Sequence, residues 1–182
     1  MNRLSLSIFA AVFLVSAHAC AQSRDRDKQI QLALSAAPAS IAARATVSIR
    51  EGGKMVELRH GDNGWTCMPP GHGDPLPRPA CFDSNGMAFV DALVTGRAPD
   101  PDKPGYSYML QGGSAWSNLD PEASKLPRGQ RDYIRIPPHF MILGSKIANA
   151  SGLPLREANP DTTRPFVMFG GTRYAILIIP VK

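Results

Sequence analysis

The sequence predicts an α+β fold: a single domain in which an antiparallel or mixed β-sheet carries two or three packed helices. Three observations predict it. Apolar residues recur at helical spacing from Ile30 to Ala37, hairpin signals at residues 51–54 and 170–171 separate apolar segments, and residues 175–179 form an unbroken apolar run. Such a run is typical of a central strand that is covered on both faces.

In the first half of the chain, helix signals alternate with strand signals. Pro38 ends the first apolar helical pattern, and Ser84 is a suitable N-cap for a second helix that stops before Gly96. Alternating segments bounded by turn residues predict strands between these helices. The expected elements are helices at residues 30–37 and 85–95 and strands at residues 45–50, 55–60 and 65–67.

The second half consists mainly of strand signals. Residues 111–121 are rich in glycine and serine, so we expect a loop there, and Gly170-Gly171 predicts a two-residue hairpin turn. The expected elements are strands at residues 106–111, 133–136, 139–143, 166–169 and 174–181 and a short helix at residues 144–151.

The chain begins with the pattern of a bacterial secretory signal peptide. Arg3 gives a positive start, residues 4–15 form a short apolar run, and residues 16–19 supply the small residues of a cleavage zone. Spanning a bilayer takes roughly 20 apolar residues, so this run is too short. We expect residues 1–21 to be a signal peptide and residues 22–182 to be one globular domain without a transmembrane segment, periplasmic or secreted.

Cys20 lies in the cleavage zone, so the cleavage position decides whether Cys20 remains in the mature chain. The small-x-small pattern Ala19-Cys20-Ala21 predicts cleavage after Ala21, which discards Cys20. The alternative is a lipoprotein anchored at Cys20. It is less favoured because Ala17 and His18 depart from the usual leucine and small residue at those positions.

Removal of residues 1–21 leaves Cys67 and Cys81, an even pair in an exported chain. The residues between them are rich in proline and glycine and cannot form regular structure. We expect a structural disulfide that closes this proline-rich loop and stabilises the domain by roughly 3 kcal/mol. A redox-active or metal-binding pair is less favoured because the CxxC spacing is missing.

The charge and the motif search exclude several classes of function. Loss of Arg3 lowers the formal charge from +5 to +4, and basic residues are interspersed with acidic ones, so we expect no nucleic-acid partner. The sequence holds no GxGxxG, phosphate loop, HExxH or S-x-x-K motif, and Ser114 lacks the second glycine of a nucleophile elbow. We therefore expect no cofactor.

His139 is the best candidate for chemistry among the three histidines that remain after cleavage. As a general base it would need a carboxylate such as Asp120 or Asp132, since histidine titrates near neutrality. On a strand, His139 and Met141 share one face, and both residue types suit copper. The favoured interpretation remains a core residue that bonds a backbone carbonyl, with Met141 filling volume and no metal bound.

Trp116 and Tyr108 are the candidates for ligand binding. Trp116 is the stronger of the two because its neighbours are loop-like, whereas an aromatic core position is the favoured interpretation for Tyr108. Either side chain could line a pocket or an interaction surface.

Several segments together resemble a family of exported bacterial proteins of unknown function. They are Asn63-Gly64-Trp65-Thr66-Cys67, Tyr108-Met109-Leu110-Gln111-Gly112-Gly113, Ser117-Asn118-Leu119-Asp120-Pro121, Pro138-His139-Phe140-Met141-Ile142 and Gly171-Thr172-Arg173-Tyr174-Ala175. The resemblance spans nearly all of residues 22–182. It implies one intact domain and carries no activity, cofactor or catalytic residue.

These observations predict an exported binding module for a small ligand or an envelope component. The alternative is a hydrolase or a metal-dependent enzyme that uses His139 with a nearby aspartate. A lipid-anchored structural protein is the third and weakest interpretation.

Overall fold

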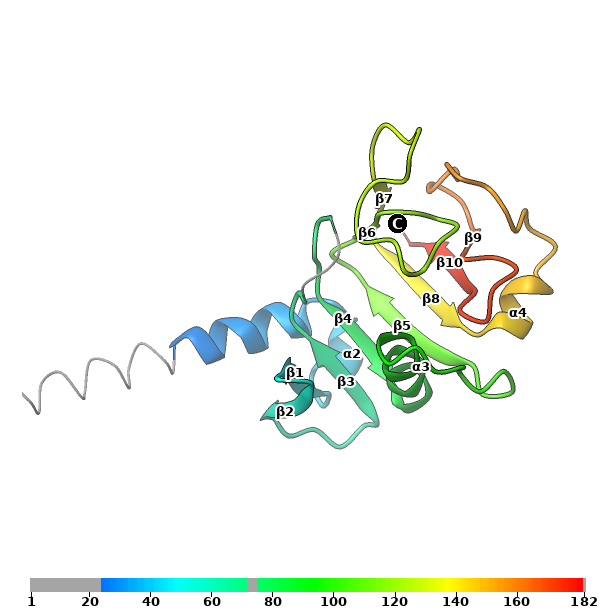
Figure 1. The fold of residues 1–182 in the computed structure, drawn as a ribbon. Coiled ribbons are helices and arrows are strands. Elements are labelled where there is room, and N and C mark those ends of the chain that lie inside the picture. Colours follow the sequence, from blue (N-terminus) through cyan, green and yellow to red (C-terminus); the bar gives the residue numbers. More distant parts are fainter. Residues whose placement is uncertain (1–23, 72–74, 182) are drawn as a thin grey trace, which may run out of the picture.

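The computed structural model describes residues 24–71 and 75–181 and confirms the α+β fold (Figure 1). Residues 24–34 form a helix, followed by α2 (Ala39–Ala42), α3 (Ser84–Val94) and α4 (Ser145–Asn149). The strands are β1 (Thr46–Glu51), β2 (Lys54–Arg59), β3 (Trp65–Met68), β4 (Ala80–Asp83), β5 (Gly105–Met109), β6 (Gly113–Ala115), β7 (Ile134–Ile136), β8 (His139–Leu143), β9 (Phe166–Met168) and β10 (Ile176–Pro180). The predicted signal peptide and Cys20 lie outside the described residues.

Eight of the strands form one mixed sheet in the order β2-β1-β3-β4-β5-β8-β10-β9, and β6 and β7 pair separately. Among the described strands, β1 and β3 are the parallel pair, and every other pairing is antiparallel. β1 and β10, the first and last strands in the sequence, belong to the same continuous sheet. The described chain therefore forms one domain.

The pairing register assigns the side chains of the large sheet to two faces. Ser107 pairs with Met141, and Met109 pairs with His139, so these four share one face. Tyr108 pairs with Phe140 on the opposite face. The first face, which we call the core face, packs against α3 and β7 in the largest apolar cluster.

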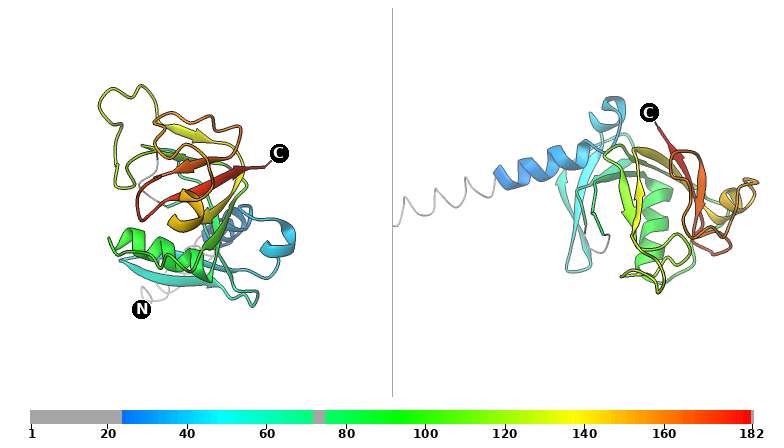
Figure 2. Two further views of the ribbon diagram at one scale, coloured as in Figure 1. Left: turned by 90° about the vertical axis from the view of Figure 1, so that its right-hand side faces the viewer. Right: turned by 90° about the horizontal axis from the view of Figure 1, so that it is seen from above.

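Among residues 24–71 and 75–181, helices pack against the opposite face at its two ends. The helix of residues 24–34 and the turn after it bring Ala33, Ala36 and Ala37 against the disulfide, Cys67–Cys81. At the far end, Ala148 of α4 packs with Val167 and Ala175. Seen from above, α2 and α4 lie toward opposite ends of the sheet (Figure 2).

The first hairpin signal is confirmed; the second correctly predicts a hairpin, but its two-residue link is wrong. Glu51 pairs with Lys54, and Gly52 and Gly53 have φ of 54° and 79°, as a two-residue turn of this kind requires. At the second site β9 and β10 do pair, but Met168 opposes Ile176. The link is therefore longer than Gly170-Gly171, because a turn around Phe169 to Ala175 precedes β10.

The second helix begins one residue earlier than expected, and Asp83 replaces Ser84 as its N-cap. The Asp83 Oδ1 atom accepts hydrogen bonds from the Gly86 N–H at 2.7 Å and from the Tyr106 N–H at 2.8 Å, which ties α3 to β5. At the other end Gly96 has φ of 68°, and the Arg97 N–H bonds the Ala92 carbonyl in a Schellman arrangement.

Two short strands, β4 and β6, were not predicted from the sequence. β4 follows a run of prolines, and β6 lies in the segment of residues 111–121 that predicts a loop. Ser114 of β6 also fixes the proline-rich loop: its Oγ accepts from the Leu76 N–H and donates to the Leu76 carbonyl. The β6–β7 pair then covers part of the core face.

The predicted disulfide is present between two buried residues that oppose each other on β3 and β4. The bond joins Cys67 and Cys81 across a sequence separation of 14 residues. It therefore pins the proline-rich loop to the sheet.

Replacing both Cys67 and Cys81 by alanine should lower the free energy of unfolding by about 3 kcal/mol, because the unfolded chain regains the freedom of the closed loop. Urea denaturation of the oxidised wild type and the double variant measures this loss. A reducing agent should destabilise the wild type and leave the variant unchanged. If the reducing agent left the free energy of unfolding of the wild type unchanged, the disulfide would not be stabilising.

Candidate functional site

His139 lies inside the protein, at the start of β8. Its side chain is fully buried, and Nδ1 lies 2.7 Å from the Pro137 carbonyl oxygen. A carbonyl only accepts, so Nδ1 carries the proton and Nε2 keeps its lone pair. Within the described part of the chain, Nε2 has no hydrogen-bond partner.

Burial lowers the pKa of the His139 imidazole below its ordinary value of 6.5, and the hydrogen bond to Pro137 opposes this shift. The ring is therefore neutral near pH 7. The chemically available feature of His139 is a neutral, buried, unpartnered nitrogen.

Two methionines lie beside His139 on the core face. Met109 is its direct partner across β5 and β8, and Met141 follows it by two residues. A Cβ atom built on Gly113 would lie 3.2 Å from His139 Cε1 and 3.6 Å from Met109 Sδ. The imidazole and the Met109 thioether therefore meet under the same backbone segment of β6.

The aspartates proposed as partners of His139 make other contacts. Asp120 is exposed, and its Oδ1 accepts from the Glu122 N–H at 2.9 Å, as in an ordinary turn. Asp132 is also exposed and lies 3.8 Å from the Arg135 guanidinium. No hydrogen bond joins His139 to Asp120, Asp132 or Ser114 among the described residues, and a fully buried imidazole does not meet a dissolved substrate.

Asn118 is a buried polar residue that the sequence did not single out as a functional candidate. Its Nδ2 donates to the Glu157 carbonyl at 2.8 Å and to the Val167 carbonyl at 3.0 Å. Its own carbonyl accepts from the N–H of Phe169, whose φ of 57° is positive. Asn118 therefore ties three segments together, and its role is structural.

The two ligand-binding candidates lie in different surroundings. Trp116 contacts Tyr133 edge-on, with ring centroids 6.4 Å apart, and its carbonyl accepts from the Gln130 side chain. Tyr108 belongs to a row of rings on the face opposite the core face. The structure describes no ring contact between Trp116 and Tyr108.

The row of rings crosses three strands. Tyr108 lies between Trp65, at 5.5 Å, and Phe140, at 4.8 Å between centroids. Phe140 also stacks on Tyr106 with an interplanar angle of 16°. Offset and tilted contacts at these distances are favourable aromatic pairs.

The middle of this face is only partly covered by the described residues. We define the open face as Tyr106, Tyr108, Phe140, Ile142 and Ile179, all exposed or half-buried. Four of them belong to no buried apolar cluster of the described chain, and Tyr108 borders the cluster at the disulfide. The open face lies between the helical covers at the two ends of the sheet.

A shallow pocket of about 340 Å³ lies elsewhere, between α3 and the loop that follows it. Its charged side chains are already paired: Arg97 with Asp91, and Lys103 with Asp100. Pairing leaves the pocket no free charge to select a ligand.

Comparisons with known proteins assign no relative to this chain. No protein-family model matches it, and neither a curated protein nor a solved structure matches it significantly. Within residues 24–71 and 75–181, no group of three or more His, Cys, Asp or Glu side chains could hold a metal ion. No helix in that part of the chain is long and apolar enough to cross a membrane.

Sequence patterns indicated His139, Met141 and Tyr108 as candidate site residues, but they did not predict which residues lie beside them in space. Met109 faces His139 only because β5 pairs with β8, which are far apart in sequence. Tyr106 and Phe140 are visible as alternating residues of strands, yet their exposure depends on where the helices pack. The period-two alternation of β8 was the available signal: it predicts that His139 and Met141 share one face of the strand and that Phe140 lies on the other.

Because of His139, the free energy of unfolding should rise with pH from the folded-state pKa of the imidazole up to about 7. The folded pKa lies below the unfolded value of 6.5, so the unfolded chain binds more protons in this range. The contribution is complete above pH 6.5 and declines as the pH falls toward the folded pKa. His139→Asn should flatten the slope of unfolding free energy against pH, measured by urea denaturation.

The control for this slope is Val94→Ala, because the Val94 side chain does not titrate and is 61% exposed. That variant should keep the wild-type pH dependence. Equal slopes for the wild type and His139→Asn would show that the buried imidazole does not titrate as described.

Asn118→Asp should lower the free energy of unfolding by about 2–6 kcal/mol. The change removes the donor of two hydrogen bonds and leaves two backbone carbonyls unpaired, at about 1–3 kcal/mol each. Asn159→Asp, at an exposed amide, should leave the urea midpoint unchanged. If both variants had the same urea midpoint, the side-chain hydrogen bonds of Asn118 would not stabilise the fold.

Proposed function

We propose that this chain is an exported binding module without catalysis of its own, and that it contacts another protein of the cell envelope through the open face. The observation that carries the proposal is the one-sided burial of β10. The sequence of residues 175–179 is apolar throughout and predicts cover on both faces. In the structure Ile176 and Ile178 are buried on the core face. On the opposite face Leu177 packs against the α4 cluster, whereas Ile179 is half-buried and belongs to no cluster of the described chain.

An uncovered apolar face is a recognised sign of an interaction site. The open face adds two tyrosines, whose rings give a large apolar area and whose hydroxyls tolerate water. Tyr106 is 39% exposed and belongs to the stacked row, so it is the side chain that a partner meets first. Aromatic residues of this kind are enriched among the residues that dominate binding energy.

The shape and charge of the open face favour a protein over a small molecule. Small ligands are usually bound in concave sites that bury most of their surface. The pocket found in the structure lies at α3, which packs on the other face of the sheet. The five residues of the open face carry no charge, so an uncharged, apolar surface of a partner is the matching occupant.

The alternative, a hydrolase or metal-dependent enzyme built on His139 and a nearby aspartate, has less support. The imidazole is buried, and the Asp120 carboxylate is engaged in its own turn. A general base needs hydrogen-bond reach to a substrate proton.

Site-specific photo-crosslinking tests the proposal. A photoreactive phenylalanine analogue at position 106, in cells that export the chain, should give one defined adduct that mass spectrometry identifies as another envelope protein. The same analogue at position 94 is the control, because Val94 is 61% exposed on α3. Absence of an adduct beyond the position-94 control, or an adduct only with a second copy of this chain, would overturn the proposal.

The identified partner should then be tested in purified form. Tyr106→Ala and Ile142→Ala should each raise the Kd by about tenfold or more, the range of dominant interface residues. Val94→Ala should leave the Kd unchanged. An adduct whose partner binds both open-face variants as tightly as the wild type would mean that proximity, and not this face, produced the crosslink.

A further inference from the structure

Three neighbouring side chains on the core face combine one unpartnered nitrogen with two thioethers. His139 Nε2 is buried and has no hydrogen-bond partner among the described residues. Leaving such an atom unmatched costs about 1–3 kcal/mol. Met109 lies directly opposite, and Met141 is the next residue of β8 on the same face.

The imidazole of His139 and the thioether of Met109 lie against the same backbone segment of β6. Gly113 of β6 lies over both His139 Cε1 and Met109 Sδ, as the position of its absent Cβ shows. Cε1 is bonded to both ring nitrogens, and Nδ1 is already engaged by the Pro137 carbonyl, so Nε2 is the nitrogen that remains to bind a ligand beside the thioether. Met141 is buried in the same apolar cluster that Met109 borders.

The hydrogen bond on the other nitrogen prepares the ring as a ligand. Metal-binding histidines generally donate their second N–H to a carboxylate or a backbone carbonyl, which fixes the tautomer and the ring orientation. Nδ1 of His139 makes this contact with the Pro137 carbonyl at 2.7 Å. The free lone pair on Nε2 then needs no proton loss to bind an ion.

We propose that His139 Nε2, Met109 Sδ and Met141 Sδ form a binding site for a monovalent copper ion. Thioether and imidazole donors select Cu(I) among the biological metals, whereas Mg²⁺ and Ca²⁺ require oxygen donors. All three donors are neutral, and a single positive charge costs less to bury than a double one. The half-buried Met109 provides the route of entry, since His139 and Met141 are buried.

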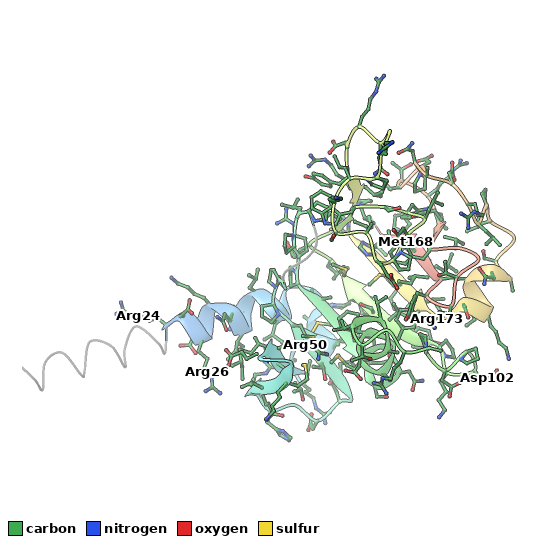
Figure 3. The ribbon with its side chains drawn as sticks, in the orientation of Figure 1. Arg24, Arg26, Arg50, Asp102, Met168 and Arg173 are labelled. Atoms are coloured by element: carbon green, nitrogen blue, oxygen red, sulfur yellow. A yellow bond between two sulfur atoms is a disulfide. The ribbon has the colours of Figure 1, made fainter. Side chains whose placement is uncertain are left out.

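Core packing alone explains two methionines equally well, so the test must keep the volume and remove the sulfur. Met109→Leu and Met141→Leu are volume-conserving changes that usually cost less than about 1.5 kcal/mol. Met168→Leu is the matched control: Met168 is buried in the same cluster, on β9 (Figure 3). Its partner Ile176 aligns with Leu143, at the opposite end of β8 from His139.

The experiment is an anaerobic titration of the disulfide-bonded chain with Cu(I), in competition with a chromophoric Cu(I) chelator and with free thiols alkylated. The wild type and Met168→Leu should bind one equivalent with equal affinity. Met109→Leu and Met141→Leu should each weaken binding by about tenfold or more. X-ray absorption of the wild-type complex should show sulfur and nitrogen neighbours.

Two results would overturn the proposal. One is a wild type that takes no Cu(I) from the chelator. The other is a wild type whose affinity is matched by both leucine variants, because that would place the ion at another site. Circular dichroism of each variant confirms that lost binding does not reflect lost folding.

Discussion

The pairing of β5 with β8 is the constraint on which the rest of the structure depends. It sets Ser107 against Met141 and Tyr108 against Phe140, and a slip of one residue would exchange the two faces. β5 is anchored by Asp83, the last residue of the neighbouring β4, whose carboxylate bonds the backbone of both α3 and β5. Close approach reinforces it, because a Cβ on Gly105 would lie 2.3 Å from the α3 backbone.

Side-chain hydrogen bonds to backbone carbonyls hold this arrangement in place. The Asn63 side chain donates to the Ile41 carbonyl, and Asn118 joins its loop to β9. The Tyr174 hydroxyl and the Arg173 guanidinium donate to the carbonyls of Arg97 and Gly96, just past the end of α3. These side chains therefore have structural roles, and none of them is free for chemistry in the contacts described.

The sequence predicted those features that depend on local chemistry. The glycine turn after β1, the disulfide and the helix ending before Gly96 follow from short-range rules. Features that depend on distant partners were missed. β4 and β6 are short, lie beside proline or glycine runs, and become strands only because neighbours supply their hydrogen bonds. The position of Met109 beside His139 and the exposure of Tyr106 are of the same kind.

The two proposed sites share β8 but can be examined separately. Successive side chains of a strand point to opposite faces, so Phe140 belongs to the open face while His139 and Met141 belong to the core face. Removing a thioether sulfur at constant volume leaves the open face as it is. Truncating Tyr106, which is exposed, leaves the core cluster intact. Partner binding and Cu(I) binding are therefore independent properties of one sheet, and the loss of either would not decide the other.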